Sequence, residues 1–250
     1  MNKIIGIIPA RHKSTRFPGK PLAGIRGKPM IQWTYENARK SISLDEVYVA
    51  TDDLRIADVV RGFGGNVIMT SVDHQSGTDR CMEAVTKLDF TPDIIVNIQG
   101  DEPLIKAKMI DQLCDVIRPR EVRLATLVQV IEDENALFDP NRVKVVLDKS
   151  GKALLFSRST IPHNNKFPKH EWVTKHVYYK HVGIYAYRLE ALKEITRLPP
   201  SKLEQMESLE QLRWLENGFD IHTGITAEVS PSVDTPEDLA KIIEIIDAAH

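Results

Sequence analysis

Residues 4–22 read IIGIIPARHKSTRFPGKPL, a stretch that joins an apolar run to a basic loop. The continuous apolar run at 4–10 is typical of a β-strand that is buried on both faces. The loop then carries four cations within ten positions and no acidic residue: Arg11, Lys13, Arg16 and Lys20. Because parallel sheets bind their ligands at the carboxyl ends of the strands, this loop lies where a ligand is expected.

The alternation of strand and helix continues through the first half of the chain. Apolar, β-rich runs predict further strands at 46–51, 66–70 and 93–100. Amphipathic runs predict helices at 29–41, 53–65, 78–88 and 107–118. Four consecutive β-then-α units predict an α/β fold with a doubly wound, mostly parallel sheet of the Rossmann-like type.

Beyond about residue 120 the pattern changes. Strands are predicted within 122–131, 142–148, 152–159 and 175–188. They suggest a smaller antiparallel, β-rich extension at about 150–200 of one domain that spans 1–250. The run SKLEQMESLEQLRWLENG at 201–218 predicts one helix, in which Ser201 and Glu204 form a capping box and Gly218 ends the helix.

The composition limits the possible functions. The chain has 33 Lys+Arg against 35 Asp+Glu, so a general nucleic-acid binder, which needs a basic face, is not expected. Its two cysteines, Cys81 and Cys114, form no CxxC motif and suit a reducing compartment. No apolar run approaches the roughly twenty residues of a membrane span, so we expect a soluble cytoplasmic protein without membrane insertion.

The chemistry of the basic loop suits a triphosphate. Arginine offers forked donors and lysine a compact charge, and Ser14 and Thr15 add further donors. A solvated basic loop is the alternative, but the position at a strand end favours phosphate binding. The loop matches neither GxGxxG nor GxxxxGK[ST], which argues against a Rossmann dehydrogenase and a P-loop NTPase.

Carboxylates follow another predicted strand end. Asp101 and Glu102 come directly after 93–100, and a carboxylate there could meet bound phosphates only through a cation. Mg²⁺ suits this role because it accepts one or two carboxylates together with phosphate and water. A simple turn is the alternative, since GDEP is good turn chemistry. For Asp234 the pattern alone favours a structural role at a helix start, with Thr235 as cap and Pro236 at the first position.

Six motifs resemble those of the sugar-acid cytidylyltransferases. PARHKSTRFPGKPL at 9–22 and VNIQGDEPLI at 96–105 resemble the whole family. Four more motifs, at 69–80, 180–188, 203–218 and 233–239, resemble the branch of this family that is specific for 3-deoxy-manno-octulosonate (Kdo). The resemblance covers essentially the whole chain. It implies a magnesium-dependent, homodimeric nucleotidyltransferase that makes CMP-Kdo and pyrophosphate from CTP and Kdo, for lipopolysaccharide or capsule assembly.

The same resemblance implies a role for individual residues. The catalytic residues are Arg11, Lys20, Asp101 and Asp234, of which Asp101 and Asp234 bind the metal. The CTP-binding residues are Pro9, Ala10, Arg11, Thr15, Arg16, Lys20, His74, Ser76, Gly77, Thr78, Arg80 and Gln99. The Kdo-binding residues are Gln99, Arg158, His181, Tyr185, Glu210 and Gln211.

Structural roles compete with several of these assignments. Ser76 or Thr78 can cap the helix predicted at 78–88, and a lone histidine such as His181 is more often structural. A face formed by Glu207, Glu210, Gln211 and Trp214 on one helix would ordinarily be solvated. Two other functions stay open: a cytidylyltransferase for another sugar acid, and a non-catalytic nucleotide-binding regulator.

Overall fold

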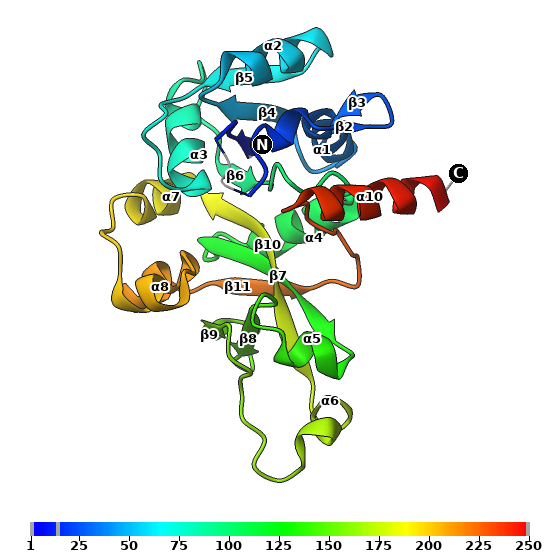
Figure 1. The fold of residues 1–250 in the computed structure, drawn as a ribbon. Helices are drawn as coiled ribbons and strands as arrows, with labels where there is room; N and C mark the ends of the chain where they lie inside the picture. The colour runs from blue at the N-terminus through cyan, green and yellow to red at the C-terminus, as the bar shows by residue number, and fades with distance from the viewer. Residues whose placement is uncertain (1–2, 14–15, 249–250) are drawn as a thin grey trace. The chain divides into compact units, whose positions relative to one another are not determined.

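The computed structural model describes residues 3–13 and 16–248 (Figure 1). The chain divides into two compact units. The first consists of 1–111 and 228–250, and the second of 112–227. The β-rich extension predicted at about 150–200 falls inside the second unit.

The first unit is built on a parallel sheet. Its strands are β1 (Ile4–Ala10), β4 (Glu46–Thr51), β5 (Asn66–Met69) and β6 (Ile94–Asn97). Their order is β6-β1-β4-β5, and every neighbouring pair is parallel. The chain moves outward from β1 to β4 and β5 and then crosses to β6 on the other side of β1. This reversal between β1 and β6 is the switch point at which such sheets bind ligands.

The helices of this unit follow the strands as predicted. They are α1 (Met30–Ala38), α2 (Leu54–Gly62), α3 (Gly77–Thr86) and α4 (Ala107–Ile117), and the unit boundary falls within α4. The Asp53 side chain caps α2 by accepting from the backbone N–H of Arg55. Ser76, and not Thr78, caps α3 by accepting from the N–H of Asp79. The predicted doubly wound α/β fold is confirmed.

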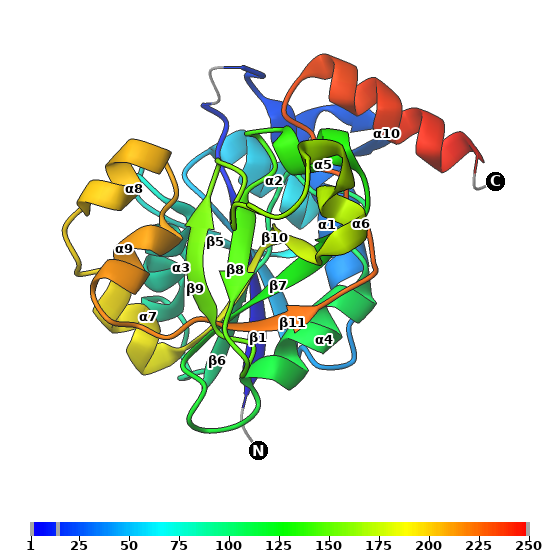
Figure 2. The same cartoon turned by 90° about the horizontal axis from the view of Figure 1, so that it is seen from below.

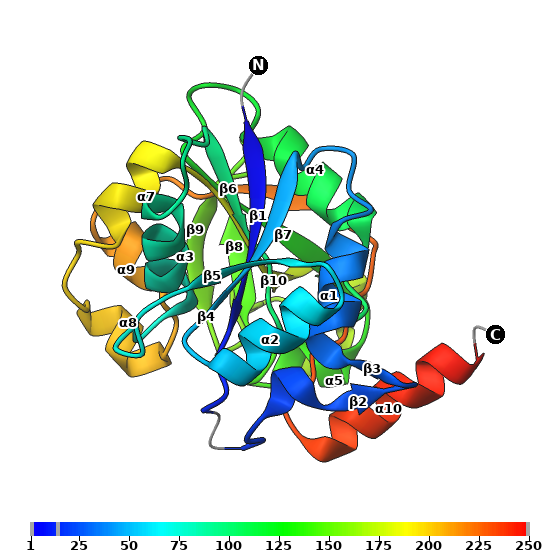
Figure 3. The same cartoon turned by 90° about the horizontal axis from the view of Figure 1, so that it is seen from above.

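A hairpin and the last helix complete the first unit. The short helix η1 (Lys20–Leu22) leads into β2 (Gly24–Ile25) and β3 (Lys28–Pro29), and α10 (Pro236–Ala248) lies beside this hairpin (Figure 3). Ile25, Val233 and Ile242 are buried together in one apolar cluster. Arg26 adds an ion pair to Asp247. The residues around Asp234 are therefore part of the same unit as the basic loop.

The second unit has a mixed sheet. Its strands are β7 (Leu124–Ile131), β8 (Lys144–Leu147), β9 (Ala153–Ser157), β10 (Tyr178–Arg188) and β11 (His222–Ile225). β7 is antiparallel to β10 and parallel to β11, while β8 is antiparallel to both β10 and β9 (Figure 2). Its shorter helices include α5 (Glu134–Phe138), η2 (Lys169–Glu171), α6 (Trp172–Lys175) and α7 (Leu189–Ile195). The predicted antiparallel strands are thus confirmed.

The prediction of a single helix at 201–218 is wrong. The chain forms α8 (Lys202–Glu207) and α9 (Gln211–Glu216), separated by a left-handed Ser208 with φ 52°. The N–H of Leu209 bonds back to the carbonyl of Glu204, which closes α8 as a Schellman-type end does. α8 buries none of its residues, whereas Trp214 of α9 is buried at 1 % exposure. The break lets α9 turn its apolar side inward. The burial of this side stabilises the fold more than the hydrogen bonds of one uninterrupted helix would.

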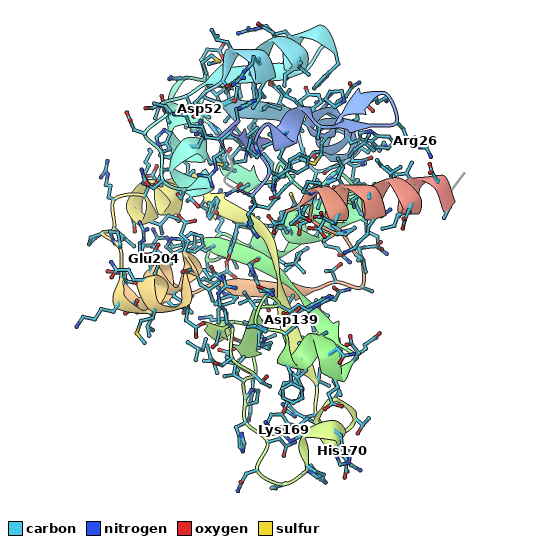
Figure 4. The ribbon with its side chains drawn as sticks, viewed as in Figure 1. Arg26, Asp52, Asp139, Lys169, His170 and Glu204 are labelled. Atoms are coloured by element: carbon cyan, nitrogen blue, oxygen red, sulfur yellow. The ribbon has the colours of Figure 1, made fainter. Side chains whose placement is uncertain are left out.

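The predicted capping box of α8 is present and gives a stability test. Ser201 Oγ accepts from the N–H of Glu204, and Glu204, labelled in Figure 4, accepts from the N–H of Ser201. We expect Ser201→Ala to lower the free energy of unfolding by about 1 kcal/mol, measured by urea denaturation. Ser159→Ala, at an exposed serine, is the control and should change it by less than about 0.5 kcal/mol. Equal stability of both variants would show that the cap contributes nothing.

Within the described part of the chain, no helix combines the length and apolar character that a membrane crossing requires.

Candidate active site

A cavity of about 280 Å³ opens at the carboxyl ends of β1 and β6 in the first unit. It is lined by twelve of the predicted site residues: Pro9, Ala10, Arg11, Arg16, Lys20, His74, Ser76, Gly77, Arg80, Gln99, Asp101 and Asp234. Thr78 lies in the first turn of α3 at 2 % exposure and does not line it, and Thr15 lies outside the described residues. The switch point of the sheet therefore gathers most of the predicted nucleotide-binding set.

The loop after β6 lies tightly against the end of β1. The N–H of Ile98 bonds to the carbonyl of Ile7, and a Cβ added to Gly100 would come within 2.6 Å of the Pro9 carbonyl oxygen. Only glycine fits at that distance. Gly100 also lines the cavity, as do Pro21 and Met30, none of which was predicted as a site residue. The GD pair at a strand end was the one available signal for Gly100.

Asp101 and Asp234 converge on the ammonium group of Lys20. Lys20 Nζ lies 2.7 Å from Asp101 Oδ2 and 3.5 Å from Asp234 Oδ1. It also donates to the carbonyl of Val233, whose N–H bonds to the carbonyl of Asp101 at 2.8 Å. Arg16 Nη2 lies 3.0 Å from Asp234 Oδ1. Backbone pairing thus brings two carboxylates that are distant in sequence to one cation.

The helix-start role favoured by pattern for this segment belongs to Thr235. Its Oγ1 accepts from the N–H of Asp238 at 3.3 Å, and Pro236 begins α10 as expected. The Asp234 side chain instead pairs with Arg16 and Lys20. Asp234 is therefore available to the cavity.

The two carboxylates suit a divalent cation. A single ammonium nitrogen sits against both, so both can share one positive centre. Among the described residues no three His, Cys, Asp or Glu side chains come together as a metal-binding group. Two carboxylates, completed by phosphate oxygens and water, form the donor set that Mg²⁺ prefers. Asp101 and Asp234 are thus the residues that would hold it.

Glu102, next to Asp101, does not face the cavity. Its side chain is almost fully buried, and this burial raises the pKa of its carboxyl to about 7. A buried carboxyl favours its neutral form because the charge is removed from water. The structure therefore separates the adjacent acids, with Asp101 at the cavity and Glu102 in the interior.

Arg80 is a buried cation that lines the cavity. Arg80 is 3 % exposed, and its Nη1 donates to Thr70 Oγ1 at 2.6 Å. Its Nη2 lies 3.5 Å from Asp52 Oδ2, just beyond the end of β4 (Asp52 is labelled in Figure 4). A buried charge needs such a partner to offset its desolvation. Asp52 was not predicted as a site residue, although two adjacent aspartates follow the strand at 46–51.

The residues assigned to the sugar lie in the second unit, apart from Gln99. Arg158 Nε donates to the carbonyl of Glu207 at 2.7 Å, and its backbone N–H donates to the Glu207 carboxylate. The rings of His181 and Tyr185 lie 5.2 Å apart, so both project from one face of β10 as predicted. Burial lowers the pKa of His181 and raises that of Tyr185, so both are neutral near pH 7.

The break between α8 and α9 changes the environment of the other two predicted sugar residues. Glu210 directly precedes α9, and Gln211 is its first residue, at 5 % exposure. The face expected on one helix therefore does not exist, and Gln211 and Trp214 are buried rather than solvated. Trp214 packs edge-on against Tyr185, with ring centroids 5.1 Å apart.

A doubly wound sheet with a basic loop and two carboxylates at its switch point defines a nucleotide-binding α/β enzyme. Comparisons with known proteins specify the class. Residues 5–221 match the family model described as Cytidylyltransferase. The chain belongs to the cytidylyltransferase family and is a nucleotidyltransferase.

Two relatives and one solved structure show the similarity. The chain is 52 % identical to 3-deoxy-manno-octulosonate cytidylyltransferase of Parabacteroides distasonis, covering 98 % of this chain and 99 % of that protein. It is 53 % identical to the protein of the same name from Thermodesulfovibrio yellowstonii, over 94 % of each chain. A structure of CMP:2-keto-3-deoxy-manno-octonic acid synthetase complexed with CTP matches with a TM-score of 0.92 and 44 % identity, over 99 % of this chain and 100 % of that one. The resemblance found in the sequence is confirmed.

Proposed function

We propose that the protein transfers CMP from CTP to the anomeric hydroxyl of Kdo and releases pyrophosphate. The convergence of Lys20 on Asp101 and Asp234 carries this proposal, because it brings a cation and two carboxylates of the kind that Mg²⁺ prefers into one cavity. The likeness to a synthetase bound to CTP supports the choice of nucleotide. The names of the relatives support the choice of sugar acid.

The residues of the first unit bind and neutralise the nucleotide. Arg11, Arg16 and Lys20 offset the charge of the triphosphate, since their donors suit phosphate oxygens. Mg²⁺ held by Asp101 and Asp234 would supply Lewis-acid stabilisation of charge at the α-phosphate. No side chain is needed as a covalent nucleophile, so the anomeric hydroxyl attacks the α-phosphorus of CTP directly. The bond to the β-phosphate breaks, and pyrophosphate and the hydroxyl proton are released. Catalysis then consists mainly of positioning and charge stabilisation.

The finer aspects of this proposal follow from the resemblance. We propose a cytoplasmic homodimer that uses magnesium and supplies CMP-Kdo for lipopolysaccharide or capsule assembly. The burial of both Cys81 and Cys114 is compatible with a reducing compartment. Sedimentation of the purified protein would test the dimer directly.

Pyrophosphate release tests the activity. The purified protein is mixed with Mg²⁺, one nucleoside triphosphate and one sugar acid. CTP with Kdo should give release, and ATP or UTP with Kdo should give little. Faster release with a sialic acid or an amino-substituted octulosonate would favour another sugar acid. CTP binding without release from any of these acids would favour the non-catalytic regulator.

Arg158 gives a test of the sugar side. A sugar acid needs a cation opposite its carboxylate, and a charged hydrogen bond contributes about 1.5–3 kcal/mol. We expect Arg158→Ala to raise the KM for Kdo about 10- to 100-fold and to change the KM for CTP less than about threefold. Arg118→Ala is the control, because Arg118 is exposed and pairs only locally with Asp115. A collapse of CTP affinity with a normal response to Kdo would remove Arg158 from the sugar side.

A further inference from the structure

Helix α3 and its C-cap residue, Lys87, hold the end of β5 and the chain segment after it with a row of charged side chains. Lys87 Nζ donates to the carbonyl of Met69 at 2.7 Å, and Arg80 Nη1 donates to Thr70 Oγ1 at 2.6 Å. Glu83 Oε2 accepts from the backbone N–H of Ser71 at 2.7 Å. Positions 80, 83 and 87 lie at i, i+3 and i+7, so they share one helix face. This face fixes the start of the loop that lines the cavity.

Glu83 also contacts a residue of the cavity wall. The same Oε2 is hydrogen bonded to Nε2 of His74, and Oε1 lies 2.7 Å from Lys87 Nζ. Partial burial alone would raise the pKa of Glu83. The bonds from Lys87, Ser71 and His74 outweigh it and lower the pKa to about 2. The carboxylate is therefore ionised at neutral pH and can only accept hydrogen bonds.

This contact determines the tautomer of His74. An ionised carboxylate requires a donor, so Nε2 of His74 carries the proton. In a neutral imidazole with a protonated Nε2, the other nitrogen is an acceptor. When the ring is neutral, Nδ1 is thus the acceptor that it presents to a ligand, and His74 lines the cavity.

We infer that Glu83 is a positioning residue, which fixes His74 so that Nδ1 accepts a hydrogen bond from a donor of the bound nucleoside. This inference rests on the proposed use of CTP. The donors of cytidine are the exocyclic amino group of the base and the ribose hydroxyls. UTP lacks the amino group, and 2′-deoxyCTP and 3′-deoxyCTP each lack one hydroxyl. Comparison of these nucleotides therefore identifies the donor.

Nucleotide affinity, measured by calorimetry without any sugar acid, provides the test. Glu83→Ala should weaken CTP binding about tenfold, which is the size of one hydrogen bond. Glu83→Gln should recover most of this loss, because its amide oxygen still accepts from Nε2. The analogue that lacks the recognised donor should bind equally to wild type and Glu83→Ala. Asp58→Ala is the control, because Asp58 is an exposed acid of α2 paired with Arg61.

A double-mutant cycle separates positioning from general destabilisation. In a His74→Ala background, Glu83→Ala should have little further effect on CTP affinity. ¹⁵N NMR of His74 at pH 8 should show the proton on Nε2 in wild type and a mixture of tautomers in Glu83→Ala. The inference is wrong if the Glu83→Ala effect is the same in both backgrounds, if Nδ1 is protonated at pH 8, or if every analogue loses affinity equally. Absence of CTP binding to wild type would instead contradict the proposed function.

Discussion

We expect Asp101→Asn and Asp234→Asn each to lower the rate of pyrophosphate release about 10³-fold, in a folded protein that still binds CTP weakly. Each replacement keeps the shape of the side chain and removes one of the two carboxylates that lie against Lys20 and that would hold Mg²⁺. A loss of 10³ corresponds to roughly 4 kcal/mol of transition-state stabilisation. This is the expected scale when the charge that offsets a triphosphate is displaced.

The design of this experiment relies on Mg²⁺ titration. Raising the Mg²⁺ concentration should recover part of the activity of both variants, and the double variant should be little worse than either single one. Asp247→Asn is the control, because Asp247 pairs with Arg26 near the end of α10. Near-normal activity of Asp234→Asn at low Mg²⁺ would remove this residue from the metal site.

Lys20→Met should change catalysis and metal binding in opposite directions. The variant loses one of the cations proposed to bind the triphosphate, so we expect kcat/KM for CTP to fall about 10²-fold, or roughly 2.7 kcal/mol. The same change removes the ammonium that lies against Asp101 and Asp234. Without nucleotide, Mn²⁺ should therefore bind about tenfold more tightly to the variant, because the ammonium no longer competes with it for the two carboxylates.

The metal measurement uses electron paramagnetic resonance of Mn²⁺ with the nucleotide-free protein. Lys28→Met is the control, because Lys28 is partly exposed and pairs with Glu36 outside the cavity. Equal Mn²⁺ affinity in wild type and Lys20→Met would show that the ammonium does not compete for the carboxylates. In that case the effect of Lys20 on turnover would act through the nucleotide alone.

Local patterns in the sequence predicted the elements well where neighbouring residues determine them. The cap at Ser76 and the capping box at Ser201 depend on contacts a few residues apart. The run at 4–10 is evident from its consecutive apolar residues, although β1 pairs with distant strands. The prediction of one helix at 201–218 failed because the burial of Trp214 depends on packing against the rest of its unit. Sequence periodicity carries no information about that packing. Helix propensity is weak enough for packing to override it.

In the candidate site, too, local sequence predicted some features, whereas others depend on residues that are distant in the chain. The position of the basic loop followed from its strand, whereas pattern alone gave Asp234 a structural role. Its approach to Asp101 depends on a backbone bond between Val233 and Asp101, which no local signal encodes. Family resemblance supplied that pairing before the structure did. Asp52 and Glu83 were missed because each acts through a partner, Arg80 or His74, whose neighbours become evident only after folding.

The discontinuity of the first unit affects when the protein can become active during synthesis. Asp101 belongs to 1–111, but Asp234 belongs to 228–250, and the whole second unit is translated between them. At about 5–20 residues per second, residues 112–227 take roughly 6–23 s to make. In this interval a ribosome-bound chain lacks Asp234, and it also lacks Val233 and Ile242, which complete the apolar cluster around Ile25. The cavity that Asp234 lines is therefore complete only after residues 228–250 have been made.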